Sequence, residues 1–121
     1  MEAKAVNRFI PSSPRKMRLV IDLIRGKRAD LAMNELLFHT KHASADAYKT
    51  LRSAMANLVQ KAEGERLEPV DMIVKAAFVN QGPTVKRISP APMGRAYRIR
   101  KRSCHLTIVV STVNSDSKVG A

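Results

Sequence analysis

One alternating pattern near the C-terminus constrains how this chain can fold. From Cys104 to Val110, apolar side chains occupy every second position, which predicts a strand with one face buried in a core. Further upstream, arginines occupy the same parity: Arg98, Arg100 and Arg102. Because an unpaired charge is costly to bury, this face cannot stay in the core along its whole length. The pattern therefore predicts a strand whose outer half leaves the domain.

The region around this strand lacks acidic residues. Residues 72–115 hold eight Lys and Arg and no Asp or Glu, residues 29–71 hold five basic and seven acidic groups, and residues 1–28 hold eight and two. The net charge of the chain is +12. A basic segment without internal salt-bridge partners needs negative charge from outside, and nucleic acid is its commonest source. The alternative is a merely soluble basic protein.

The segment SSPRKMRLVIDLIRG predicts an amphipathic helix with both ends marked. Ser13 suits the N-cap, Pro14 suits the first helical position, and Gly26 suits the residue that follows the C-cap. Apolar residues recur with the spacing of one helical stripe at Met17, Val20, Ile21 and Ile24.

The beginning of this helix carries positive charge in an unfavourable place. Arg15 and Lys16 lie in the first turn, where the helix dipole disfavours cations unless an anion is bound. Arg15, Arg18 and Arg25 also share one side of the helix. These positions indicate a phosphate site. The alternative is a solvated face with an Arg18–Asp22 pair.

Two further helices are expected, at residues 30–38 and at about 41–63, with Gly64 ending the second. The longer helix has a stripe of small and apolar residues, which are Ala47, Leu51, Ala54, Leu58 and Ala62.

Strands are expected at residues 4–10, at MIVKAAFVN and at HLTIVVS. In MIVKAAFVN, Val74, Ala76 and Phe78 alternate with the residues between them. In HLTIVVS, the inward face holds Leu106, Ile108 and Val110, and the outward face holds His105, Thr107 and Ser111.

The expected fold class is α+β, with three helices packed on a small three-stranded antiparallel sheet and a long projecting β-hairpin. Residues 1–121 form a single domain. Its globular part spans about 3–81 and 103–111, its extended basic hairpin about 82–102, and its tail, expected to be flexible, 112–121.

The hairpin is expected to be cationic on both faces, because Lys101 points away from Arg98 and Arg100. Arginine suits phosphate, since its planar fork binds two oxygens at once. The alternative is a solvated edge hairpin that uses charge to prevent aggregation.

At the hairpin tip, Pro90 and Pro92 predict an open loop, and Gly94 permits a backbone conformation closed to other residues. The tip also carries the apolar residues Val85, Ile88 and Met93, which suggests that it packs against a partner. The alternative is a floppy loop.

No catalytic or metal site is expected. The three histidines lack metal-ligand spacing with Cys104, which lies on the apolar parity of its strand. The chain has no phosphate-binding glycine loop and no acidic cluster in its basic half. A lone cysteine and the lack of a membrane-length apolar run or signal peptide favour a cytoplasmic protein. A nucleic-acid-binding regulator is the rival class, but no dimer seam is evident.

Three motifs together resemble the bacterial type of the large-subunit ribosomal protein twenty-two family: SPRKMRLVIDLIRGK, SAMANLVQKAE and FVNQGPTVKRISPAPMGRAYRIRKRSCHLTIVVS. The resemblance covers about Ala3 to Ser111. It implies a non-enzymatic constituent of the large subunit that binds 23S ribosomal RNA and supports assembly. It also implies that the hairpin tip lines the nascent-peptide exit tunnel, near macrolide antibiotics.

The implied partners are 23S ribosomal RNA, neighbouring large-subunit proteins and the nascent peptide, with no membrane, homo-oligomer, cofactor or metal. The residues expected to contact RNA are Arg15, Lys16, Arg18, Arg25, Lys27, Lys86, Arg87, Arg95, Arg98, Arg100, Lys101 and Arg102. The resemblance places the tunnel-lining tip at Lys86, Arg87, Ile88, Ser89, Pro90, Ala91, Pro92 and Met93.

Overall fold

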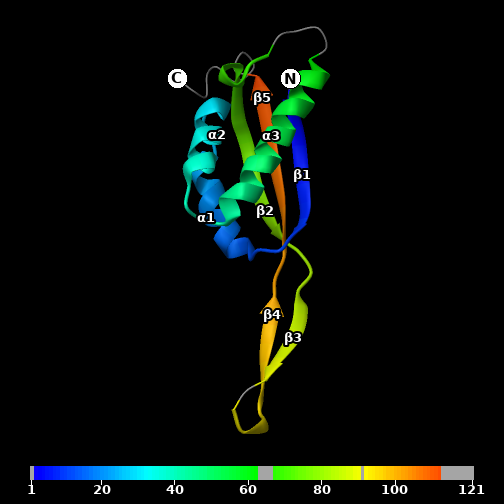
Figure 1. The fold of residues 1–121 in the computed structure, drawn as a ribbon. Helices are drawn as coiled ribbons and strands as arrows, with labels where there is room; N and C mark the ends of the chain where they lie inside the picture. The colour runs from blue at the N-terminus through cyan, green and yellow to red at the C-terminus, as the bar shows by residue number, and fades with distance from the viewer. Residues whose placement is uncertain (1, 63–66, 91, 113–121) are drawn as a thin grey trace.

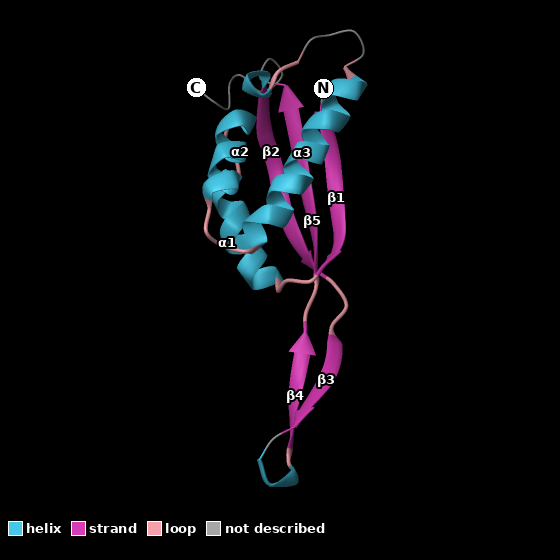
Figure 2. Ribbon diagram, in the orientation of Figure 1, coloured by secondary structure: helices cyan, strands magenta, loops and turns pink. Residues whose placement is uncertain are grey.

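The computed structural model describes residues 2–62, 67–90 and 92–112, and these form two sheets and three α-helices (Figures 1 and 2). In chain order the elements are β1 (Glu2–Ile10), α1 (Pro14–Ile24), α2 (Ala29–Phe38), α3 (Ala43–Lys61), the 3₁₀ turn η1 (Pro69–Asp71), β2 (Met72–Gln81), β3 (Val85–Pro90), the turn η2 (Pro92–Gly94), β4 (Ala96–Lys101) and β5 (Cys104–Thr112).

The larger sheet has the strand order β1-β5-β2, with both pairs antiparallel. All three helices cover one face of this sheet (Figure 2). The core between them is aliphatic, and Leu106, Ile108 and Val110 of the central strand are fully buried, as expected from the alternation. The predicted fold class is confirmed.

Helix α1 forms where its sequence signals predict. The Ser13 side chain accepts a hydrogen bond from the Lys16 backbone N–H at 3.3 Å, and Pro14 begins the helix. Gly26 has a φ of 80°, which a residue with a β-carbon rarely adopts. Its N–H donates to the Val74 carbonyl of β2 at 3.0 Å, so the end of the helix is fastened to the sheet. The predicted stripe is buried: Met17, Val20, Ile21 and Ile24.

The other two helices are also present. α3 is shorter at both ends than the expected 41–63, and Gly64, its expected end, lies outside the described residues. Its predicted stripe is buried: Ala47, Leu51, Ala54, Leu58 and Ala62.

The simple alternation expected along β2 is wrong. The register with β5 slips between Val74 and Ala76, so one extra residue is accommodated there as a bulge. An inserted residue moves all later side chains to the opposite face. Ala77 and Val79 are consequently buried, while Phe78 is 46% exposed.

Thr107 and Ser111 lie on the face of β5 opposite to Leu106, Ile108 and Val110, as expected, but their side chains are buried rather than exposed. They lie on the central strand, where neighbours cover them from both sides. Thr107 is flanked by Val6 of β1 and Phe78 of β2 in the register of the sheet.

The hairpin projects from one end of the sheet (Figure 1). Strands β3 and β4 form a separate two-stranded sheet, which runs from the Val85–Lys101 pair to the Pro90–Ala96 pair. The outer part is not one continuous strand with β5, because Arg102 and Ser103 interrupt it. The Gly82 N–H donates to the Ser103 carbonyl at 2.9 Å and closes the root of the hairpin.

Candidate nucleic-acid interface

The register of the hairpin sorts its side chains onto two faces. On one face, Lys86 lies directly opposite Arg100, and Arg98 lies opposite Ile88. On the other face, Lys101 lies opposite Val85 and Arg87 opposite Ile99, with Tyr97 further out. Like charges directly across a strand pair repel each other, so the Lys86–Arg100 pair opposes hairpin formation in the isolated protein. Both faces are cationic, as their alternation indicates.

The positive charges of the hairpin have no acidic neighbours to balance them. Among the residues that the structure describes, no carboxylate pairs with any hairpin cation, and all of these side chains are exposed. They are Lys86, Arg87, Arg95, Arg98, Arg100, Lys101 and Arg102. Their charge is available to an external anion.

The hairpin tip turns through two consecutive left-handed residues. Gly94 has a φ of 71°, as its type suggests, and Met93 has a φ of 64° that the sequence does not predict. Met93 is 96% exposed and Ile88 is 75% exposed, so the tip presents apolar side chains outside the core. Ala91, one of the expected tip residues, lies outside the described residues.

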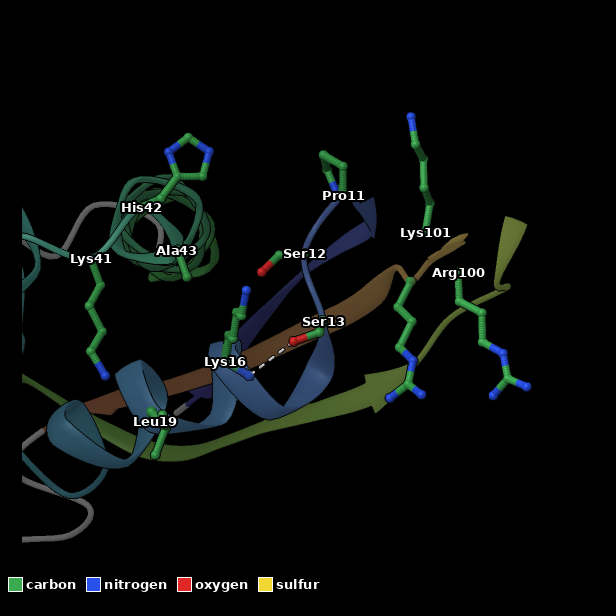
Figure 3. A pocket seen from close by; sticks show the side chains of 11 residues that line it. Pro11, Ser12, Ser13, Lys16, Leu19, Lys41, His42, Ala43, Arg100 and Lys101 are labelled. Atoms are coloured by element: carbon green, nitrogen blue, oxygen red, sulfur yellow. Dashed lines mark hydrogen bonds between the residues drawn. The ribbon is translucent and has the colours of Figure 1, made fainter. Parts of the chain in front are cut away.

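At the root of the hairpin, three separate segments enclose a hollow of about 840 Å³ (Figure 3). The linker after β1 and the first turns of α1 form one side, the beginning of α3 forms another, and the end of β4 completes it. The lining residues are Pro11, Ser12, Ser13, Lys16, Leu19, Lys41, His42, Ala43, Arg100, Lys101 and Arg102. We call this feature the root hollow.

The electrostatics of the root hollow favour an anion. Five of its lining residues are Lys or Arg, and no acidic residue lines it. Two helices, α1 and α3, begin at its wall, so their dipoles present additional partial positive charge (Figure 3). Phosphate oxygens suit these donors.

Lys41 and His42 line the root hollow but are not among the residues that the sequence predicts to bind RNA. Like Arg15 and Lys16, they lie near the beginning of a helix, which is the one local signal that could have marked them. Their approach to Arg100 and Arg102 depends on how α3 packs across the sheet, and no local pattern encodes that packing.

Two of the arginines expected to bind RNA, Arg18 and Arg25, also make hydrogen bonds within the fold. Arg18 donates to the Val79 carbonyl at 3.1 Å, and Arg25 donates to the Ala77 carbonyl at 2.8 Å. Both acceptors belong to β2, the outer strand of the sheet, so these arginines use N–H groups to cover its edge. Asp22 pairs with Arg25 at 2.8 Å rather than with Arg18.

The remaining expected residues lie in different surroundings. Lys27 forms an ion pair with Glu35 of α2, whereas Arg15 is exposed. Lys16, Arg100, Lys101 and Arg102 are the expected binding residues that come together in the root hollow.

Other chemistry has little support in the described part of the chain. Residues 2–62, 67–90 and 92–112 contain no group of three His, Cys, Asp or Glu side chains placed to hold a metal ion. Burial raises the pKa of the Cys104 thiol, which therefore stays protonated inside the core. Among the described helices, none is long and apolar enough to span a membrane.

Comparisons with known proteins identify the family of this chain. Residues 5–111 match the family described as ribosomal protein L22p/L17e. A protein named large ribosomal subunit protein uL22 from Chlorobium phaeobacteroides is 58% identical, over 94% of this chain and 97% of its own length. Proteins of the same name from Chlorobaculum tepidum and Chlorobium limicola are 57% and 53% identical, over 95% and 98% of this chain and 97% and 100% of theirs. The chain therefore belongs to the ribosomal protein L22p/L17e family.

Proposed function

We propose that this protein binds large-subunit (23S) ribosomal RNA through its hairpin and root hollow, and that it supports assembly of the cytoplasmic large subunit. As a member of its family, it is a structural, non-enzymatic component of that subunit. The observation that carries the proposal is the row of exposed hairpin cations without carboxylate partners in the described chain.

The shape of the hairpin suits insertion between RNA segments. Each stem strand has six residues, and at about 3.3 Å per residue the stem extends roughly 20 Å. Cations on both faces allow the stem to contact phosphates on two sides at once. Because the deep major groove of A-form RNA is closed to side chains, such an arm recognises shape and backbone rather than a base code.

The root hollow suits a bend in the RNA backbone. A phosphate there would accept hydrogen bonds from the side chains of Lys16 and Arg102, and the dipole of α1 would add partial positive charge. Such contact would offset the unfavourable placement of cations in the first helical turn.

Salt dependence tests the RNA-binding proposal. If about seven to ten cations contact phosphates, affinity for a 23S RNA fragment should fall by roughly 10³-fold or more between about 50 and 200 mM salt. Filter binding or fluorescence anisotropy measures this slope. A nearly flat plot of log affinity against log salt concentration would contradict the proposal.

The hairpin tip is proposed to line the nascent-peptide exit tunnel, where it meets the nascent peptide and neighbouring large-subunit proteins. Support comes from the family resemblance and from the exposed apolar Ile88 and Met93 at the far end of the arm. Deleting residues 86–88, which belong to β3, should change macrolide sensitivity while subunit profiles stay normal, because the cations of β4 and the contacts at the root hollow remain. Unchanged drug sensitivity with normal assembly would place the tip elsewhere.

A further inference from the structure

The aromatic side chains of this protein contribute little to its core. The chain has three Phe and two Tyr, and four of these five are exposed: Phe9 by 64%, Phe38 by 79%, Phe78 by 46% and Tyr97 by 63%. Single exposed apolar residues are ordinary on protein surfaces. Phe9 differs from the other three in its backbone conformation, which directs the ring away from the core.

Phe9 lies in a backbone conformation that residues with large side chains seldom adopt. Its φ is 58°, and the register of β1 with β5 is interrupted between Asn7 and Ile10. Strained residues at strand bulges persist where the surroundings impose them, and they commonly re-aim a side chain at a functional site. Here Ile10 is buried, whereas the Phe9 ring remains largely exposed.

His105 of β5 fixes the position of Phe9. The Phe9 backbone N–H donates to His105 Nδ1 at 3.0 Å. The two rings meet edge to face, with centroids 5.0 Å apart and planes at 88°. The Phe9 ring is thus exposed and oriented at the same time, as a stacking surface requires.

The Phe9–His105 pair lies beside the proposed RNA interface. A β-carbon added at Gly82, in the root of the hairpin, would lie 3.3 Å from His105 Cε1. Pro11 and Arg102 line the root hollow, and along the chain they lie two residues from Phe9 and three residues from His105, respectively. Of the chain segments that meet here, residues 3–21 and 72–112 contain no acidic residue, and α3 carries Asp46 in its first turn.

We propose that Phe9, positioned by His105, stacks against an unpaired base of the RNA whose backbone occupies the root hollow. This inference rests on the proposed RNA-binding function and adds a base contact to its phosphate contacts. Aromatic rings stack on bases of any sequence, and unpaired RNA bases are the ones accessible to them. The excess of basic residues favours an anionic partner, and the ability of an exposed aromatic ring to stack on bases favours RNA over an acidic protein.

The absence of tryptophan from the chain allows a direct test of stacking. Phe9→Trp introduces a single indole at the proposed platform, and Phe38→Trp introduces one at the end of α2, at a position that does not line the root hollow, as the control. On titration with a 23S RNA fragment, the indole fluorescence of the Phe9→Trp variant should be quenched, and that of the Phe38→Trp variant should change little. Equal or absent quenching in both variants, with RNA bound, would overturn the proposal.

Affinity separates a stacking role from a structural one. Asparagine tolerates the left-handed conformation, so Phe9→Asn removes the ring while keeping the backbone. RNA affinity should fall roughly 10-fold with little change in melting temperature, and Phe38→Asn should leave affinity unchanged. A lower melting temperature with unchanged affinity would make the ring structural and overturn the proposal. Failure of the unmodified protein to bind RNA would instead contradict the proposed function.

Discussion

The α2 side of the domain and the projecting hairpin use charge in opposite ways. Around α2, Lys27 pairs with Glu35, and Arg28 contacts Asp30 through two hydrogen bonds of 2.7 and 3.0 Å. The hydrogen bond from Arg28 holds the pKa of Asp30 below its ordinary value. On the hairpin, the cations have no carboxylate partner in the described chain. The charges around α2 are paired within the folded chain, whereas those of the hairpin require an external anion.

Apolar side chains show the same division. Ile108 of β5 is fully buried, but Ile88 of β3 is 75% exposed. Burial from water is what makes an apolar side chain stabilising. The sheet and helices can therefore fold by themselves, while the hairpin gains its stabilising contacts from whatever surrounds it.

Matched isoleucine truncations should give the largest difference in stability. Ile108→Ala should lower the free energy of unfolding by about 2–5 kcal/mol, because it leaves a cavity in the core. Ile88→Ala should change it by less than about 0.5 kcal/mol in the isolated protein. Urea unfolding measures both. A comparable loss from the two variants would show that the hairpin contributes to the core.

A smaller change in the free energy of unfolding should distinguish an arginine that supports the fold from one that contacts RNA. Arg18→Gln removes a part-buried hydrogen bond to Val79 at the sheet edge and should cost about 1–2 kcal/mol of unfolding free energy. Arg98→Gln should leave unfolding unchanged but reduce the salt-dependence slope of RNA binding by about one. Thermal or urea unfolding together with binding titrations checks both variants. Stability losses of equal size would remove the distinction.

The sequence predicted the features that depend on neighbouring residues. The stripe and caps of α1 follow from helical spacing and from Ser13, Pro14 and Gly26, whose conformational preferences act locally. The projecting hairpin was predictable because the arginines occupy the same alternating positions as the core residues that follow them along the strand. By contrast, the burial of Ala77 was missed because a single inserted residue reverses the strand faces after Val74.

The candidate site was only partly predictable for a similar reason. The hairpin cations are visible in the sequence because they are clustered and free of acids. The root hollow is assembled from segments near residues 11–19, 41–43 and 100–102, which only tertiary packing brings together. The partnership of Phe9 and His105 depends likewise on the β1–β5 register and its bulge.

Replacing the hairpin tests most directly whether folding and binding reside in separate parts of the molecule. The hydrogen bond from the Gly82 N–H to the Ser103 carbonyl already brings the two ends together, so residues 83–102 can be exchanged for an Asn-Gly turn. We predict that helical circular dichroism and cooperative unfolding persist, while affinity for 23S RNA falls by roughly 10³-fold or more as seven cations are removed. Loss of cooperative folding, or RNA affinity equal to that of the intact protein, would contradict this account.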